Sequence, residues 1–515
     1  MTAHEKQTRR QFLRDCALAS AGVAALAAGR AIPKESKMRQ PHILFLMTDQ
    51  HRYDCLGCDG NPAIRTPHFD RIAREGVTFT RAYSSTPTCC PARAAILTGQ
   101  NPWHHGQLAM GQLAEHYPIE LPRLLAAAGY YTFAVGKLHY RPQRNLHGFH
   151  GALLDESSRG VAEGFVSDYR HGFYERAPSR DPNATGIGSN DYRAGVYVLP
   201  EELHPTRWTG DTAVQLIQDY QRREPLFLKV SFARPHSPYD PPQRCWDLYR
   251  DEGMPAPHLG QWAGKYAPRS SDRDDLWHGD LGIATARHSR HGYYGSVSFI
   301  DEQVGRVLAA LEERGMLQDA LILFTADHGD MLGDHHLWRK SYPYEASAHI
   351  PLLLRWPQEW GMQERRGKRL AHPVELRDLL PTFLEAAGTK VPPGVDGDSL
   401  LKLVRGETAG WRPWIDLEHA RCYSERNNWN ALTDGRWKYV YHAYAGEEML
   451  FDLQADPGET SDLAPDPAHA ATLKLWRERL VAHLAERGPD YVQDGRLVPR
   501  PHQGIYSPHY PGSRV

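Results

Sequence analysis

Cysteine is scarce in this sequence, with 7 residues in a chain of 515. So few thiols in so long a chain exclude a disulfide framework of the kind that small secreted domains need. Cys55 and Cys58 form one C-x-x-C pair, but no second pair follows it to complete a zinc site. We therefore expect ordinary packing or one local disulfide there, with half a zinc site as the less favoured alternative.

A strong charge of one sign is also absent, because 60 Lys and Arg residues stand against 62 Asp and Glu residues. A nearly neutral chain has no overall basic field, so we expect no nucleic-acid partner, although a local pocket can still be strongly charged. The 44 glycines and 38 prolines are spread along the chain without a repeat. This composition suits a loop-rich enzyme better than a helical bundle or a repeat protein.

The sequence also lacks a long apolar run, which limits how the N-terminal segment can interact with a membrane. Residues 8–31 read TRRQFLRDCALASAGVAALAAGRA, where paired Arg9 and Arg10 precede an Ala-rich run that is too short and too mild to span a bilayer stably. We interpret residues 1–31 as a twin-arginine export signal. It would deliver folded protein to the periplasm or the outside, without stable membrane insertion. An ordinary amphipathic N-terminal helix is the alternative.

Short apolar runs alternate with helical patterns through the first three quarters of the chain. Such runs are typical of buried strands in a mostly parallel sheet. They cover residues 42–49, 130–137, 225–236, 320–329 and 350–357. Helical spacing at 211–223 and 293–315 completes an α/β pattern. We predict a large, mostly parallel sheet with helices on both of its faces.

The length of the chain favours two unequal domains, which we assign to residues 39–405 and 406–515. After about residue 405, short alternating segments precede a helical pattern at 467–488. This order predicts a small antiparallel sheet with a packed helix. The last stretch, 495–515, is rich in Pro, His and Tyr. It fits either a tail that lies across the larger domain or a disordered end.

Polar side chains stand where four of the predicted strands end. They are Asp49, Lys137, His236 and the pair Asp327 and His328. Open α/β sheets bind ligands just beyond the carboxyl ends of their strands, so separate segments can converge on one pocket. Each of these residues alone would be an ordinary solvated strand end, but the set together predicts a functional site.

Adjacent cysteines at 89 and 90 precede Pro91 and an apolar, helix-like run that ends at Gly99. Proline suits the first turn of a helix and glycine suits its end, so Cys89 is predicted at a helix N-terminus. Free N–H groups and the helix dipole favour a negative group there, and Arg93 one turn along adds a fixed positive charge. A buried structural pair of thiols fits the pattern equally well.

The segment CCPARAAILTG, which begins at Cys89, resembles the type I sulfatase signature C-x-P-x-R followed by a helix and Thr-Gly. Position 92 is Ala where many sulfatases have Ser, which leaves the core pattern intact. Further sulfatase-like segments follow the family's order: ILFLMTDQHRYDCLGCDG, VGKLHY, FARPHSPYDPP, TADHGDMLGDHHLWRKSYPYEASAHIPLLLRWP and GVDGDSLL, with LTDGRWKYVY and LFDLQADPGETSDLA after them. The resemblance thus covers nearly the whole mature chain, which is identified as a member of the type I, formylglycine-dependent sulfatases of the alkaline phosphatase superfamily.

This resemblance implies that Cys89 is a precursor. A formylglycine-generating enzyme would oxidise it to formylglycine (3-oxoalanine), whose hydrate attacks the sulfur of a sulfate ester and displaces the alcohol. The second hydroxyl of that hydrate then expels sulfate, so water need not attack sulfur. Cys90 occupies the variable position of the signature, while Pro91 and Arg93 are its recognition residues.

The resemblance also implies a divalent cation. Its ligands would be Asp49, Gln50, Asp327, His328 and the modified Cys89. Many sulfatases have a second Asp where this chain has Gln50, and Ca²⁺ is the expected ion. The Asp-Gln start and the histidine also resemble phosphonate monoester hydrolases of the same superfamily, so Mn²⁺ stays open.

Further roles carried over from the family fall on five residues. Arg93, Lys137 and Lys340 would neutralise the sulfate oxygens and stabilise the hydrate. His139 would orient or deprotonate the hydrate, and His236 would protonate the departing alkoxide.

The expected function is therefore hydrolysis of a sulfate ester, with a sulfated saccharide or small molecule as substrate. A phosphonate or phosphate ester hydrolase, and a catalytically silent protein that binds sulfated glycans, are the alternatives. Specificity is expected in segments without a strong motif, at 153–195, 258–279 and 424–434.

Overall fold

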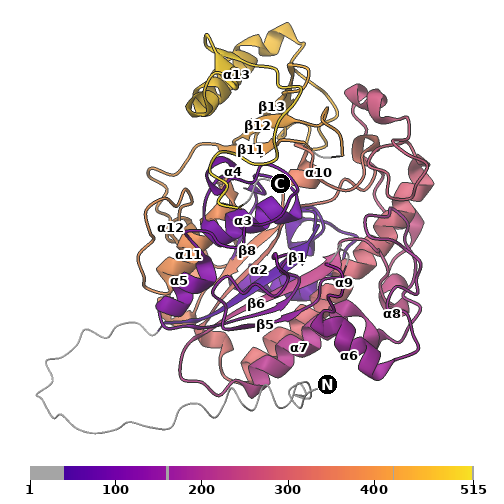
Figure 1. The fold of residues 1–515 in the computed structure, drawn as a ribbon, viewed down its shortest axis with the longest axis vertical. Helices are drawn as coiled ribbons and strands as arrows, with labels where there is room; N and C mark the ends of the chain where they lie inside the picture. The colour runs from indigo at the N-terminus through magenta and orange to yellow at the C-terminus, as the bar shows by residue number, and fades with distance from the viewer. Residues whose placement is uncertain (1–39, 158–161, 422, 513–515) are drawn as a thin grey trace, which may run out of the picture.

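The computed structural model describes residues 40–157, 162–421 and 423–512, so the predicted export signal lies outside the described residues. Its centre is a sheet of eight strands with helices on both faces (Figure 1). The strands in spatial order are β5 (Gly151–Leu154), β4 (Tyr131–Gly136), β6 (Leu226–Pro235), β1 (His42–Asp49), β7 (Ala320–Ala326), β8 (Leu352–Arg355), β2 (Val77–Phe79) and β9 (Lys368–Leu370). The predicted fold class is confirmed.

Neighbouring strands from β5 to β7 are parallel, whereas β8 runs antiparallel to both β7 and β2. The predicted apolar runs fall on β1, β4, β6, β7 and β8. Because β1 and β7 pair in register from His42 opposite Ala320 to Thr48 opposite Ala326, their carboxyl ends lie at the same level. This register brings the residues that follow the two strands together.

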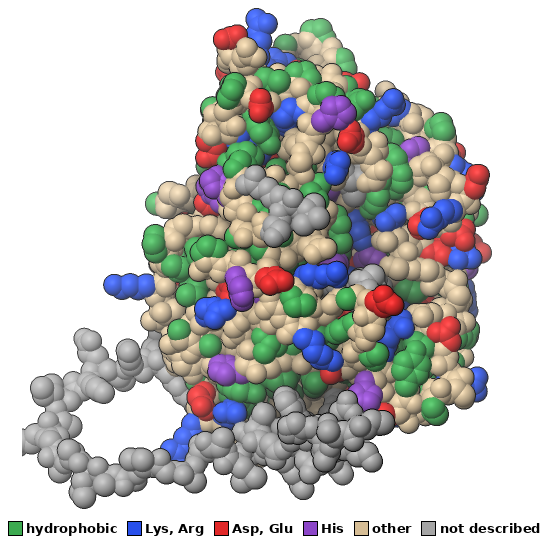
Figure 2. Space-filling model, viewed as in Figure 1, with side chains coloured by type: hydrophobic (Ala, Val, Ile, Leu, Met, Phe, Trp, Pro, Cys, Tyr) green, Lys and Arg blue, Asp and Glu red, His purple; other side chains and the backbone are tan. Residues whose placement is uncertain are grey.

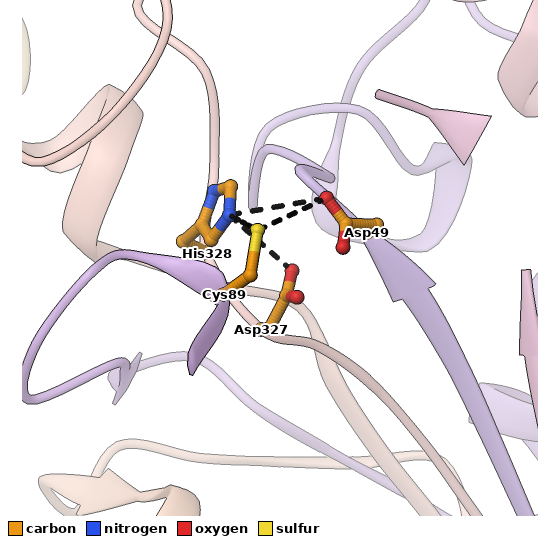
Figure 3. Close-up of side chains that lie close together, drawn as sticks. All are labelled: Asp49, Cys89, Asp327 and His328. Atoms are coloured by element: carbon orange, nitrogen blue, oxygen red, sulfur yellow. Dashed lines mark hydrogen bonds and ion pairs between the residues drawn. The ribbon is translucent and has the colours of Figure 1, made fainter. Parts of the chain in front are cut away.

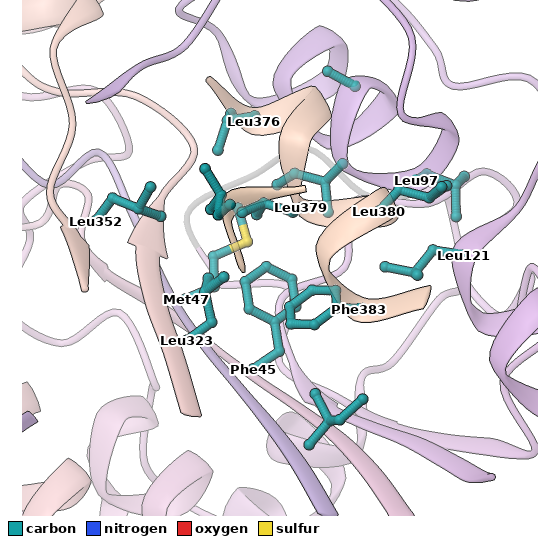
Figure 4. Packing of buried hydrophobic residues seen from close by; sticks show 14 of the residues in the cluster. Phe45, Met47, Leu97, Leu121, Leu323, Leu352, Leu376, Leu379, Leu380 and Phe383 are labelled. Atoms are coloured by element: carbon teal, nitrogen blue, oxygen red, sulfur yellow. The ribbon is translucent and has the colours of Figure 1, made fainter. Parts of the chain in front are cut away.

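Two sets of helices cover the sheet. One face carries α3 (Cys89–Thr98), α5 (Leu121–Ala127), α11 (Leu379–Ala386) and α12 (Leu400–Arg405), and the other carries α2 (Pro67–Glu75), α6 (Asp168–Arg176), α7 (Pro205–Asp219) and α9 (Gly282–Glu313). Strand β1 serves both, because Phe45 and Met47 point to the first face and Leu44 and Leu46 to the second. Figure 4 shows the Phe45 ring beside Phe383 of α11, with Met47 reaching toward Leu379 of the same helix.

The helix predicted at 211–223 ends at Asp219 in α7, and the one predicted at 293–315 begins earlier, at Gly282 in α9. Shorter elements complete the larger domain: α4 (Pro102–His105), α8 (Gln243–Trp246), α10 (Glu345–Ala348), and the paired strands β3 (Ala82–Tyr83) and β10 (Val374–Glu375).

The C-terminal part forms the small antiparallel sheet and helix that the sequence predicts. Its strands are β11 (Ile415–His419), β12 (Trp429–Thr433), β13 (Trp437–His442) and β14 (Glu447–Asp452), and its helix is α13 (Ala470–Leu484). Leu432 and Leu450 of the sheet pack with Trp476 of α13. The opposite face, through Trp429, packs on Tyr83 of the larger domain. The exact boundary at 405/406 stays a prediction.

The C-terminal stretch lies across the larger domain rather than apart from it. After the short pair β15 (Val492–Gln493) and β16 (Arg496–Leu497), the Ile505 carbonyl accepts a hydrogen bond from the Leu108 amide at 2.8 Å. Tyr510 Oη donates to the Gln112 carbonyl at 2.7 Å. Of the two alternatives for the tail, the first is the one observed.

Cys55 and Cys58 are both free thiols, and Cys55 packs in an apolar cluster, which confirms the packing interpretation of this pair. No helix in the described part of the chain is both long and apolar enough to cross a membrane. Basic, acidic and apolar side chains are interspersed on the face shown in Figure 2, rather than gathered by sign.

Candidate active site

Cys89 lies at the N-terminus of α3, as predicted, and is almost completely buried. Gly99 ends this helix with a φ of 69°, a left-handed conformation that glycine adopts without strain. The preceding Thr88 is held by its hydroxyl, which lies 2.6 Å from Ser341 Oγ and 2.9 Å from His419 Nε2. The helix mouth is therefore tied to a loop of the larger domain and to the C-terminal sheet.

Asp49 ends β1, Asp327 and His328 follow β7, and all three meet Cys89 in one buried cluster (Figure 3). One ligand atom from each of the four residues lies within 4.8 Å of the others. The Cys89 Sγ is 3.2 Å from His328 Nε2 and 3.7 Å from Asp49 Oδ1. His328 Nδ1 lies 2.9 Å from the Gly329 carbonyl, so this hydrogen bond directs Nε2 into the cluster.

In each of the two carboxylates, the Oδ1 and Oδ2 atoms have different partners. Asp49 Oδ2 pairs with Lys137 Nζ at 2.7 Å and Arg93 Nη2 at 3.0 Å, and Asp327 Oδ2 accepts from Arg93 Nε at 3.1 Å. The Oδ1 atoms of both face His328 Nε2, at 3.9 Å from Asp49 and 3.6 Å from Asp327. Arg93 and Lys137 thus hold one oxygen of each carboxylate and turn the other toward the cluster.

Electrostatics keep the cluster charged despite its burial. Burial alone would raise the pKa of Asp49, but Lys137 and Arg93 hold that pKa well below its ordinary value. Burial would lower the pKa of His328, yet Asp327 and Cys89 raise it overall. A buried set of two carboxylates, one imidazole nitrogen and a fourth donor attracts positive charge, so these residues fit a divalent cation.

Gln50 is held beside the cluster by both ends of its amide. Its Oε1 accepts from Lys340 Nζ at 2.7 Å, and its Nε2 donates a short hydrogen bond to Asp330 Oδ2. Asp330 also accepts from Tyr239 Oη at 2.5 Å and is fully buried. Gln50 as a metal ligand stays a prediction. The sequence reasoning missed Asp330, although it lies in the same TADHGD motif as Asp327.

His236 and Lys340 meet at the edge of the cluster. Lys340 Nζ lies 2.5 Å from His236 Nε2, while His236 Nδ1 lies 3.0 Å from the Ser237 carbonyl. Burial, together with Lys340 and Lys137, lowers the pKa of His236 well below its ordinary value. In this arrangement the ring is neutral: its Nδ1–H donates to the Ser237 carbonyl, and its Nε2 accepts from Lys340.

His139 follows β4 and is mostly buried, and its backbone N–H donates to Glu156 Oε1 at 3.1 Å. Its action on the hydrate stays a prediction. A second missed residue is Lys229, which is buried on β6 with its ammonium 5.4 Å from the centre of the Phe45 ring. Burial, reinforced by Arg93, lowers its pKa to about 7. Within an apolar strand pattern, nothing distinguishes it from a core position.

The segments in which specificity was expected reach the site in part. Asn190 Oδ1 accepts from Lys340 Nζ at 3.3 Å, so the 153–195 segment touches the candidate active site. From the 258–279 segment, Trp277 stacks on Tyr423 with ring centres 5.7 Å apart. Tyr342, two residues after Lys340, also contacts Tyr423.

A mostly parallel sheet covered by helices, with buried acidic and basic groups at its carboxyl edge, is the arrangement expected of a hydrolase of the alkaline phosphatase superfamily. The family model for sulfatases matches residues 41–389, and the model for the C-terminal part of N-sulphoglucosamine sulphohydrolase matches residues 333–486. The chain belongs to the sulfatase family, which makes it a sulfuric ester hydrolase.

The sequences of related proteins match this chain over most of their length. An arylsulfatase of Clostridium perfringens is 35% identical, with 89% of this chain and 97% of that protein covered. A choline-sulfatase of Rhizobium meliloti is 32% identical, with 86% and 87% covered. The solved structure of a phosphonate monoester hydrolase from Silicibacter pomeroyi is similar with a TM-score of 0.73 at 26% identity, covering 90% of this chain and 100% of that one.

Proposed function

We propose that this protein hydrolyses sulfate esters of saccharides, using formylglycine made from Cys89 and a divalent cation, after export directed by residues 1–31. The observation that carries this proposal is the position of Cys89 at a helix N-terminus, within 3.2 Å of His328 Nε2 and 3.7 Å of Asp49 Oδ1. A thiol among hard ligands would be an odd choice in itself. It makes chemical sense if the sulfur stands where an oxygen of the formylglycine hydrate lies in the mature enzyme.

Asp49, Asp327 and His328 would hold the cation, with Gln50 beside them, and the bound cation would supply Lewis-acid stabilisation of negative charge. Ca²⁺ is our first choice and Mn²⁺ the second, because carboxylate oxygens suit both ions and the histidine favours the second. Arg93 and Lys137 orient the carboxylates through their Oδ2 atoms. Their positive charge also favours an anionic ester in a site from which water is largely excluded.

Proton transfer to the leaving alcohol falls to the pair Lys340 and His236. The neutral His236 accepts from Lys340 at 2.5 Å, and burial lowers the pKa of Lys340 despite its acidic neighbours. Lys340 can therefore give a proton to His236 Nε2 more readily than a solvated lysine could, and this same Nε2 proton would pass on to the departing alkoxide while Nδ1–H stays on the Ser237 carbonyl. His139 would orient the hydrate from the end of β4.

A phosphonate or phosphate ester hydrolase is the second candidate. The Asp-Gln start at Asp49 and Gln50 resembles such enzymes, and the similar structure from Silicibacter pomeroyi is a phosphonate monoester hydrolase. The sulfate and phosphonate reactions differ in the central atom and in the size of the group transferred, so the preferred cation and the preferred ester should change together.

The test compares kcat/KM for 4-nitrophenyl sulfate and for the 4-nitrophenyl ester of phenylphosphonate, with Ca²⁺ and with Mn²⁺. The enzyme is prepared alongside a formylglycine-generating enzyme, and Cys89→Ala serves as the control. We expect the sulfate to be preferred and the control to be inactive on both esters. Preference for the phosphonate would replace the proposal by its second candidate, and full activity of Cys89→Ala would refute the nucleophile.

A further inference from the structure

The nucleophile precursor and the proposed proton donor are joined through their neighbours in the chain. Thr88 directly precedes Cys89, and Ser341 directly follows Lys340. The Thr88 Oγ1 and Ser341 Oγ atoms are 2.6 Å apart, and the Ser341 N–H donates to the Pro87 carbonyl at 3.0 Å. The separation of the two reactive side chains therefore depends on contacts made by the residues next to them.

Both of these neighbours are also held by the C-terminal sheet. The Thr88 hydroxyl lies 2.9 Å from His419 Nε2, and the Ser341 carbonyl accepts from Trp429 Nε1 at 3.0 Å. His419 ends β11 and Trp429 begins β12, where the two residues pair directly across the strands. All four side chains are buried. One cross-strand pair thus contacts both sides of the candidate active site.

The local structure at Thr88 and Ser341 depends on these contacts. Thr88 is the N-cap residue of α3, where a threonine hydroxyl ordinarily accepts from an N–H of the first turn. Within this fully described helix the hydroxyl makes no such bond and meets His419 and Ser341 instead. Ser341 has a φ of 81°, a left-handed conformation that a residue with a Cβ keeps only where its surroundings hold it. Its N–H, carbonyl and hydroxyl are all hydrogen-bonded, and these bonds hold it there.

His419 brings no charge to the site. Burial lowers its pKa to about 3, so the ring is neutral near pH 7. A hydroxyl can donate to Nε2 or accept from it, so the contact with Thr88 is a hydrogen bond with either tautomer. The residue therefore affects the helix mouth through this bond and through its packing.

We propose that His419 and Trp429 are positioning residues for the reaction, and that they hold the nucleophile at position 89 and Lys340 at the separation that proton transfer to the leaving alcohol requires. They act through Thr88 and Ser341 and do not touch the substrate. The inference rests on the proposed function, to which it adds a role for the C-terminal sheet.

The ratio of kcat for phenyl sulfate to kcat for 4-nitrophenyl sulfate tests this role. Phenolate is the poorer leaving group and depends more on protonation, to which a positioned acid contributes about 100- to 10,000-fold. We expect His419→Phe and Trp429→Phe to lower the ratio about tenfold. His419→Gln, which can still form a hydrogen bond with Thr88, should restore most of it. A loss of folded or formylglycine-bearing protein lowers both kcat values equally, so it leaves the ratio unchanged.

Trp356→Phe is the matched control. Trp356 is fully buried, and its Nε1 donates to the Gly361 carbonyl at 2.9 Å. It follows β8, which runs antiparallel to β7, so it lies at the opposite edge of the sheet from Asp327. This variant should lose stability but keep the kcat ratio.

Alkylation of the unconverted protein gives a second readout that does not depend on activity. Cys89 and Cys245 are both buried, so iodoacetamide reaches either thiol only when the chain opens around it. In protein made without the formylglycine-generating enzyme, peptide mass spectrometry compares the two rates. In His419→Phe and Trp429→Phe, Cys89 should react about tenfold faster relative to Cys245, an increase that the loss of one hydrogen bond can supply. Global unfolding would expose both thiols and leave this alkylation ratio unchanged.

The positioning role requires both ratios to change. It is refuted if either the kcat ratio or the alkylation ratio in His419→Phe and Trp429→Phe stays at the value found for Trp356→Phe. Failure of the proposed function looks different, because the wild type itself, bearing formylglycine, would then release no sulfate from either ester. In that case the positioning role is refuted together with the reaction.

Discussion

Replacing Asp49 by Asn should weaken cation binding far more than it disturbs the fold. Lys137 and Arg93 both donate to Asp49 Oδ2, so the asparagine will keep its oxygen toward these two cations. Its NH₂ group must then take the position of Oδ1, which faces Cys89 and His328. On the side that faces the divalent cation, an N–H donor thus replaces an oxygen acceptor, and the negative charge of the carboxylate is lost.

The expected size of the effect follows from binding linkage. Loss of an outer-shell partner of a metal ligand costs up to about 100-fold in affinity, and loss of a ligand should cost at least as much. At a cation concentration 100 times the wild-type Kd, the wild type gains about 2.7 kcal/mol in unfolding free energy. A site about 100-fold weaker gains about 0.4 kcal/mol at the same concentration.

Isothermal titration with Ca²⁺ and Mn²⁺ gives the Kd of the cation. Unfolding at a series of cation concentrations gives the increment in unfolding free energy that cation binding supplies. Asp416→Asn is the matched control, because Asp416 is a buried aspartate on β11 that pairs with Arg377 at 3.0 Å. The control should be less stable than the wild type but keep its cation increment. An unchanged Kd in Asp49→Asn would show that this carboxylate is not a ligand.

Three further predictions concern the surroundings of the cluster. Asp330→Asn can donate to the Gln50 amide as well as accept from it, so the amide is free to turn, and titration should show cation affinity about 10- to 100-fold weaker. Burial would raise the pKa of Asp334, but Arg290 and Arg52 lower it overall. The ionised Asp334 therefore stabilises the folded state fully above the pKa of the unfolded state, about 4, and this contribution is lost as pH falls below that value. Unfolding midpoints of Asp334→Asn should therefore depend less on pH between about 4 and 2 than those of the wild type, and equal slopes would contradict the assignment. Cys90→Ser should retain both the aldehyde at position 89 and the kcat for 4-nitrophenyl sulfate, since position 90 is the variable one in the sulfatase signature.

Much of the fold is readable from the sequence because buried parallel strands are nearly continuous apolar runs. Strands β1, β4, β6 and β7 stand out for this reason, and so does their common edge. The short strands β2, β5 and β9 do not, because three or four residues carry too little pattern. The early start of α9 at Gly282 was missed because its first turns reverse the usual pattern of a half-buried helix: Ile283 is exposed, whereas Ser289 and Arg290 are buried.

The candidate site was predictable to the level of which residues meet, but not how they contact one another. The strand ends and the sulfatase-like motifs predict that Asp49, Cys89 and Asp327 lie in one site. In each carboxylate one oxygen faces Arg93 or Lys137 and the other faces the cluster. This orientation depends on side-chain rotamers, which no sequence pattern encodes. Arg93 is the example, since its expected contact was sulfate and its observed partners are the two aspartates.

The measurement that tests the account most directly combines peptide mass spectrometry at Cys89 with sulfate release from an aryl sulfate. Samples with different degrees of conversion come from varying the co-produced formylglycine-generating enzyme. The account predicts aldehyde or its hydrate at position 89, with Cys90 untouched, and activity that rises in proportion to the converted fraction. Sulfate release that is independent of this fraction, or an unconverted Cys89 in fully active protein, would contradict it.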